Sequence, residues 1–225
     1  MDLSREFSWK SLSEPENLFW PAYFWYWNGP PTPDVLRRQL ADMAGHDARG
    51  VCVVPMPHEF RPVTMNASMD VDYLSPEFFQ RVKVAVDEAA RLGMHYWLYD
   101  EGDWARHHGL ASGGHLGGED ETFAPVSRGF GSVMRPLRAM DVPGVDVIWR
   151  QLWPGKENHH FPKFASSAAH QNGTALALTE SFGVYGNGLT PAQMKWLVDY
   201  QYVRGLTLLV CGVYPLSTRD HLMLG

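Results

Sequence analysis

The chain of 225 residues is 45% hydrophobic and 13% aromatic, which is enough apolar material to bury a sizeable core. Its 25 acidic and 19 basic residues give a net charge of −6 without a basic block, so we expect no nucleic-acid partner. No apolar run approaches the ~18 residues of a membrane span, and the chain begins without a secretory signal pattern. We predict one cytoplasmic domain over residues 1–225 that has no membrane partner.

Seven segments have the composition of strands. They are short, rich in aromatic and β-branched residues, and bounded by glycine, proline or polar residues. The predicted strands are residues 19–28, 51–54, 95–99, 110–116, 144–148, 174–179 and 206–213.

Helix signals alternate with these strands. In three places Thr or Ser precedes a proline, and apolar residues follow at helical spacing. These helices are predicted to begin at Pro33, Pro76 and Pro191 and to end near Gly50, Gly93 and Gly205. A shorter helix is predicted at residues 163–171.

Alternating strands and helices of these lengths predict βα units around a parallel sheet. Residues 103–140 depart from the pattern, because they are glycine-rich and show no clear amphipathic helix. We therefore predict an α/β fold of the (β/α) TIM-barrel type that is incomplete, with about seven strands. In such barrels the chemistry lies at the C-terminal ends of the strands.

Carboxylates follow three of the predicted strands. A glycosidase needs two carboxyl groups that face one sugar, one as general acid and the other as base or nucleophile. A solvated strand end or a salt bridge is the alternative explanation for each carboxylate. The carboxylates are Asp100 and Glu101, Glu119 and Asp120, and Glu180.

Glu180 is the strongest of these candidates. It directly follows the apolar segment ALALT, and Gly183 and Gly186 allow a tight turn beside it. Tryptophans near the strand ends favour sugar binding, since sugar rings stack on aromatic side chains, although core packing explains strand aromatics equally well.

Histidines raise a metal hypothesis, which leaves a barrel metallohydrolase as a further alternative. The adjacent pairs His107-His108 and His159-His160 are poor chelators, because neighbouring side chains on a strand point to opposite faces. Oxygen ligands near Asp100, Glu101 and Asp103 suit calcium better.

Six segments together resemble glycoside hydrolase family 106, the α-L-rhamnosidases, and the uncharacterised bacterial glycosyl hydrolases around that family. The segments are FWYWNG, GVCVVPMP, YLSPEFF, HYWLYDEGDW, VPGVDVI and ALTESFGVYG, and the resemblance runs from Phe19 to about Tyr214. It implies a barrel hydrolase that inverts configuration with a carboxylic acid and a carboxylate base, assisted by calcium.

The resemblance also implies roles for individual residues. Glu180 matches the seventh-strand carboxylate that activates water, while His115 and Glu119 match the fifth-strand motif. The family's fourth strand, with its general acid, has no counterpart here, so we expect Glu119 or Glu101 to supply the proton. The expected substrate-binding residues are Trp27, Asn28, Trp97, Asp100, Trp104, His115, Asp146 and Tyr185.

The sequence therefore predicts a hydrolase of α-L-rhamnosides or similar glycosides, with carbohydrate as its partner and calcium as the candidate cofactor. The alternative is an inactive, truncated barrel that only binds carbohydrate or acts as a scaffold. An open barrel edge would also permit self-association between copies of the chain.

Overall fold

The computed structural model describes residues 8–57, 69–98, 133–155, 159–186 and 188–218, and the backbone of residues 115–116. The chain divides into two compact units, which are described separately. Unit 1 comprises Met1–Pro15, Ala105–Gly212 and Leu224–Gly225. Unit 2 comprises Glu16–Trp104 and Val213–Met223.

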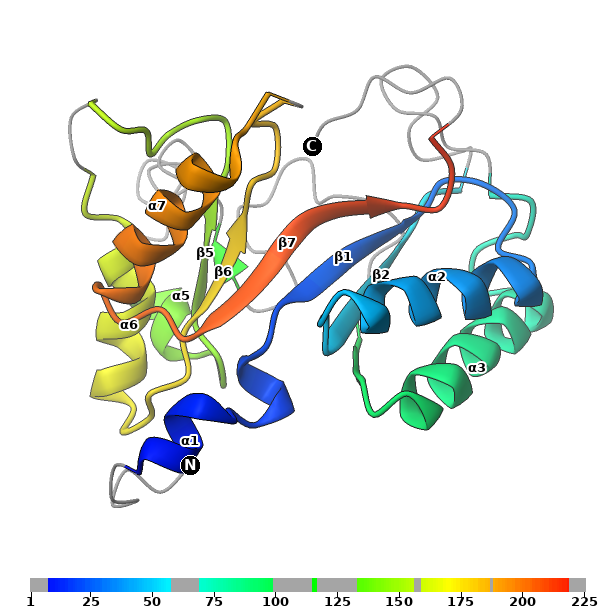
Figure 1. Cartoon of the computed structure of the whole chain (residues 1–225), viewed down its shortest axis with the longest axis horizontal. Coiled ribbons are helices and arrows are strands. Elements are labelled where there is room, and N and C mark those ends of the chain that lie inside the picture. Colours follow the sequence, from blue (N-terminus) through cyan, green and yellow to red (C-terminus); the bar gives the residue numbers. More distant parts are fainter. Residues whose placement is uncertain are drawn as a thin grey trace. The chain divides into compact units, whose positions relative to one another are not determined.

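Unit 2 contains parallel strands in the order β3-β2-β1, with helices α2 and α3 packed beside them (Figure 1). Beyond the end of β7, the Leu216 N–H donates a hydrogen bond to the Tyr26 carbonyl at 2.8 Å. The elements of this unit are η1 (Asn17–Phe19), β1 (Ala22–Trp27), α2 (Pro33–Gly45), β2 (Gly50–Pro55), α3 (Pro76–Arg91) and β3 (His95–Trp97).

Both helices of unit 2 begin where the sequence predicts. The Thr32 and Ser75 hydroxyls accept hydrogen bonds from backbone N–H groups of the first turn, and a proline follows each of them. Helix α2 ends at Gly45, earlier than predicted, because Asp47 adopts a left-handed φ of 64° that turns the chain into β2.

The core of unit 2 is aromatic. Trp25 and Trp27 are fully buried and meet edge to face, with ring centroids 5.6 Å apart. They pack with Leu36 and Leu40 of α2 and with Phe78 of α3, so this face of β1 is held by the two helices.

Unit 1 is a parallel sheet in the order β7-β6-β5-β4, and α6 and α7 lie along one side of β5 and β6 (Figure 1). Its elements are α1 (Trp9–Ser13), β4 (His115–Leu116), α5 (Met134–Arg138), β5 (Gly144–Val147), α6 (Pro162–Gln171), β6 (Leu178–Ser181), α7 (Pro191–Tyr202) and β7 (Leu208–Pro215). The last residues of β7, from Val213 onward, belong to unit 2.

Three elements of unit 1 differ from their predictions. Strand β6 starts at Leu178 and contains Glu180, whereas the sequence places a strand at 174–179 that ends before this residue. The reason is that backbone groups just before Leu178 bond to a side chain instead of to a neighbouring strand. The Thr207 hydroxyl accepts from the Ala177 N–H at 3.1 Å and donates to the Ala175 carbonyl at 2.9 Å. The short helix α5 lies in the segment where no helix is predicted, and only His115–Leu116 of the strand expected at 110–116 is described.

The predicted parallel α/β architecture with seven strands is confirmed. Within the described ranges, β3 is an edge strand of unit 2 and β4 is an edge strand of unit 1, so the strands form an open sheet, as an incomplete barrel does. The single domain expected over residues 1–225 stays a prediction. Among the helices of the described ranges, none is long and apolar enough to cross a membrane.

Candidate active site

The candidate site lies on two neighbouring strands of unit 1. Asp146 on β5 is aligned with Glu180 on β6, and both side chains are buried, with 7% and 4% of their surface exposed. Because neighbouring strands are about 4.8 Å apart and aligned residues share a face, the two acidic side chains stand next to each other. The structure thus brings together one predicted catalytic and one predicted substrate-binding residue.

The strand pattern shows which face of the sheet carries these carboxylates. Val145 and Val147 of β5 belong to the apolar core formed with α6 and α7. Side chains alternate along a strand, so Asp146 projects from the opposite face of the sheet, away from these helices. The same alternation places Glu180 on that face, since its neighbour Thr179 bonds to Gln201 of α7.

Two glycines fit closely around the Glu180 carboxyl group. A Cβ atom added at Gly183, in the loop after β6, would lie 3.2 Å from Glu180 Oε1 and 3.0 Å from Ile148 Cγ2. A Cβ atom added at Gly212, on β7, would lie 3.3 Å from the same oxygen. Any larger residue at either position would displace the carboxylate, so the absence of side chains there fixes its location.

On the helix side of β6, a buried polar network anchors the strand. Gln201 is fully buried and accepts a hydrogen bond from the Thr179 hydroxyl. Its amide nitrogen donates to Ser181 Oγ at 3.0 Å and to the Leu197 carbonyl at 3.1 Å. Since Thr179 and Ser181 flank Glu180, this network fixes the position and orientation of that segment of β6 relative to α7.

The loops after β5 and β6 contain unusual backbone conformations. Of six non-glycine residues with positive φ in the described ranges, four are in these loops: Trp149 at 57°, Arg150 at 55°, Phe182 at 75° and Val184 at 59°. Each such conformation costs roughly 1–2 kcal/mol, and it is least suited to the β-branched Val184. Strain of this kind concentrates at functional sites, where surrounding contacts hold it in place.

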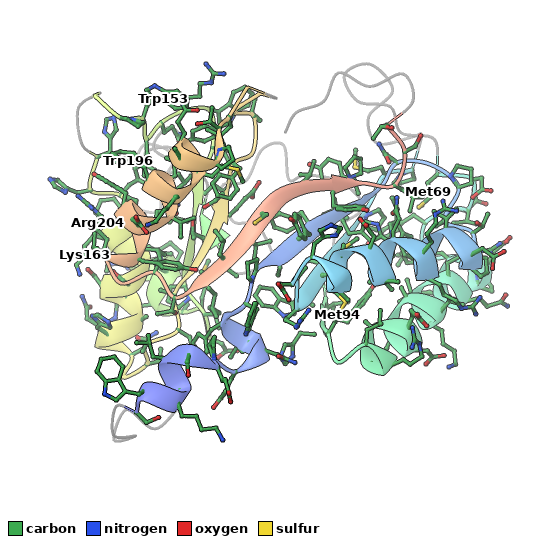
Figure 2. All side chains as sticks on the ribbon, in the orientation of Figure 1. Met69, Met94, Trp153, Lys163, Trp196 and Arg204 are labelled. Atoms are coloured by element: carbon green, nitrogen blue, oxygen red, sulfur yellow. The ribbon has the colours of Figure 1, made fainter. Side chains whose placement is uncertain are left out.

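Hydrogen bonds tie the two loops together. The Trp149 N–H donates to the Gly183 carbonyl at 3.1 Å, and Arg150 Nε donates to the Tyr185 carbonyl at 2.7 Å. The Arg150 guanidinium also lies over the Trp153 ring, 5.2 Å from its centroid, and Figure 2 labels this tryptophan. The loop after β5 is therefore fastened to the loop that follows Glu180.

Tyr185, an expected substrate-binding residue, lies inside this arrangement. Its ring stacks on Trp153 with centroids 6.1 Å apart, and its hydroxyl donates to the Leu152 carbonyl at 2.9 Å. Burial raises the pKa of this phenol well above its usual range, because the ionised form would lose its hydration. With only 1% of its surface exposed, Tyr185 holds the loop, and its contact with substrate stays a prediction.

Trp27 and Asn28, also expected to bind substrate, end strand β1 in unit 2. Trp27 is fully buried against Phe78, although its indole N–H reaches no acceptor in the part of the chain that the structure describes. The Asn28 amide donates to the Ser217 carbonyl at 3.1 Å and accepts from the Ser217 N–H at 3.0 Å. These contacts favour packing and backbone anchoring for the two residues, and sugar contact stays a prediction.

The other expected site residues are only partly covered by the structure. Trp97 ends β3, is partly buried, and is aligned with Cys52 of β2. The backbone of His115 pairs with Gly144. Glu101, Glu119, Asp100 and Trp104 lie outside the described residues.

No metal site is found in the described ranges, where no three His, Cys, Asp or Glu side chains gather closely enough to hold an ion. The residues expected to favour calcium, Asp100, Glu101 and Asp103, lie outside those ranges, as do His107 and His108. A calcium site therefore stays a prediction from the family resemblance.

Sequence reasoning missed several residues that shape the site. Gly212 lies in a strand that the sequence predicts well, and a glycine within an apolar strand is a known sign of close approach by another group. Gln201 is the polar residue on an otherwise apolar helix face, which was a second available signal. The left-handed backbone of Trp149 and Arg150 could not be predicted, because neither residue type favours a positive φ.

Comparisons with known proteins show a distant structural likeness. A solved glycoside hydrolase family 5 protein from Bacteroides vulgatus ATCC 8482 is similar with a TM-score of 0.43 and 8% sequence identity, over 86% of this chain. This chain covers 57% of that protein. No family model and no curated protein match the sequence, so the resemblance to family 106 stays a prediction.

Proposed function

We propose that this chain is a glycoside hydrolase in which Glu180 is the catalytic carboxylate, with α-L-rhamnosides as the first substrate class to test. The observation that carries the proposal is the aligned pair of buried acids, Asp146 and Glu180, on one face of a parallel sheet. The choice of rhamnosides comes from the sequence motifs that resemble family 106.

The chemistry of glycoside hydrolysis suits such a pair. One carboxyl group must protonate the leaving oxygen while an ionised carboxylate removes a proton from water. In the proposed reaction, the water oxygen bonds to the anomeric carbon as Glu180 takes its proton. In the same displacement the bond from that carbon to the leaving oxygen breaks, and the proton donor gives its proton to that oxygen.

The separation of the two strands favours different roles for the two acids. An inverting enzyme requires carboxyl groups ~6.5–9.5 Å apart, whereas aligned residues on neighbouring strands are only about 4.8 Å apart at Cα. Asp146 therefore suits binding of a substrate hydroxyl or of the attacking water beside Glu180. The proton donor in this proposal is Glu119 or Glu101, the two other glutamates that follow predicted strands.

A panel of aryl glycosides headed by an aryl α-L-rhamnoside tests the proposal, with calcium or with a chelator. Glu180→Gln should reduce kcat by about 10³-fold or more, because it removes the base while keeping the shape of the side chain. Asp199→Asn is the matched control, since Asp199 is an exposed carboxylate on α7 paired with Lys195, and it should keep full activity.

The stereochemistry of the product tests the mechanism separately. Nuclear magnetic resonance of the first sugar released should show the inverted anomer. A retained anomer would instead assign Asp146 and Glu180 as an acid and nucleophile pair at the ~5 Å spacing of retaining enzymes. Absence of turnover across the panel, from a wild-type chain that melts cooperatively, would refute the enzymatic proposal.

A further inference from the structure

Trp149 is an exposed tryptophan at the candidate site, and it is one of the tryptophans near strand ends that the sequence indicates for sugar binding. Its side chain is 63% exposed, which leaves a large apolar surface in water. Its backbone φ of 57° is unfavourable for a bulky residue. Trp149 is not among the residues of the apolar core of unit 1, whereas Val147, two residues earlier, is one of them.

The position of Trp149 is coupled to that of Glu180. Trp149 follows Asp146 by three residues, and Gly183 follows Glu180 by three residues. The hydrogen bond from the Trp149 N–H to the Gly183 carbonyl, 3.1 Å long, thus extends the alignment of the two acids into the loops. Three residues of chain span at most about 10 Å, so the Trp149 backbone stays within that distance of Asp146.

The loop that carries Trp149 is fixed rather than adaptable. Arg150, the next residue, is bonded to the Tyr185 carbonyl and covers the Trp153 ring. Trp153 in turn stacks on the buried Tyr185. Because its backbone is held in this way, the exposed indole is in place before a flat apolar ligand binds. Binding therefore costs less conformational entropy than it would on a flexible loop.

We propose that Trp149 is a stacking platform for a sugar ring that binds beside Asp146 and Glu180. This inference rests on the proposed function and names a substrate-positioning residue for the same site. The C–H face of a pyranose packs on the exposed indole, and the hydroxyl groups at its edge bond to the buried carboxylates. The ligand class is therefore a glycoside with one apolar ring face, bound by aromatic and acidic side chains together.

The test compares Trp149→Ala and Trp149→Phe with Trp9→Ala, in the full chain. Trp9 is the control because it is 78% exposed on the short helix α1. The probe is the aryl glycoside that the wild type hydrolyses fastest. Trp149→Ala should raise KM about tenfold with kcat within about threefold, while Trp149→Phe and Trp9→Ala should keep KM within about threefold of wild type.

A second measurement separates this inference from the proposed function. In the Glu180→Gln chain, saturating aryl α-L-rhamnoside should shield Trp149 from acrylamide quenching, seen as the difference from the double variant that also carries Trp149→Phe. If wild type turns over substrate but Trp149→Ala behaves like Trp9→Ala, the platform is wrong and the hydrolase stands. If nothing is hydrolysed but Trp149 is shielded, the platform stands alone, and if neither occurs, both are refuted.

Discussion

Asp146 and Glu180 occupy the same register position on β5 and β6, and both are buried on the sheet face opposite α6 and α7. Gly183 and Gly212 lie close to the Glu180 carboxylate, and the hydrogen bonds of Gln201 hold the strand that carries it. Together they restrict the position of this carboxylate.

Gly212→Ala should lower activity without unfolding the chain. The new methyl group would lie 3.3 Å from Glu180 Oε1 and 3.5 Å from Gly183 Cα, so the carboxylate must shift by a few tenths of an ångström. Misplacement on that scale should reduce kcat/KM about tenfold, while Tm stays within about 3 °C. Steady-state kinetics and thermal melting check both values. Gly188→Ala is the control, because no atom of the described residues lies within 4 Å of its added Cβ atom. Equal activity loss in both variants would contradict the close fit of Gly212 against Glu180.

Gln201→Ala should destabilise unit 1 strongly. The substitution removes the buried amide that accepts from Thr179 and donates to Ser181, and it leaves a cavity beside β6. Unsatisfied buried hydroxyls and the cavity together should lower the free energy of unfolding by about 3 kcal/mol. Urea denaturation measures this loss. The comparison is Gln193→Ala, which removes only the exposed capping box of α7 and should cost about 1 kcal/mol, and similar losses would count against the network.

Val184→Asn should stabilise the chain, although it replaces an apolar side chain. Val184 has a φ of 59°, a conformation that asparagine tolerates far better than a β-branched residue. We expect the free energy of unfolding to rise by about 1 kcal/mol and Tm to rise by a few degrees. The same change at Val198, in the middle of helix α7, should lower Tm instead. A fall in Tm for both variants would show that the loop is not strained.

Alkaline pH should destabilise the protein through Cys211. Burial raises the pKa of this thiol on β7 to about 12, whereas an unfolded thiol titrates near 8.5. Between these two values the unfolded chain binds fewer protons than the folded chain, so the free energy of unfolding falls as pH rises. Urea denaturation at pH 7.5 and 9.5 should show that wild type loses about 1 kcal/mol more than Cys211→Ala. Identical losses would mean that the thiol ionises equally in both states.

Most helices and strands of the fold can be predicted from short stretches of neighbouring residues. Helices α2, α3 and α7 begin at the predicted prolines, because capping hydroxyls at Thr32, Ser75 and Thr190 act on the backbone immediately after them. The strands are also predicted, because short apolar runs rich in β-branched and aromatic residues are bounded there by glycine, proline or polar residues. Local signals fail where a distant residue decides, as at β6, whose start is set by the Thr207 side chain.

The site was predicted only in part, for the same reason. Glu180 and Asp146 are recognisable as acids near strand ends, but their alignment depends on the register of β5 against β6, which no single segment encodes. Trp27 shows the converse difficulty. The sequence cannot distinguish an aromatic residue that contacts a ligand at a strand end from one that packs in the core. In the structure, Trp27 packs on Phe78.

The paired hydrogen bonds between Asn28 and Ser217 have a consequence for how the chain is made. These partners are 189 positions apart, so at about 5–20 residues per second the ribosome needs roughly 10–40 s to supply the second one. During that interval β1 has emerged, but the backbone that bonds to its end has not. An aromatic strand with an uncovered edge invites pairing with other nascent chains. We therefore expect a lower growth temperature, or chaperones that hold unfolded chains, to raise the yield of folded protein more than added stability of the native state does.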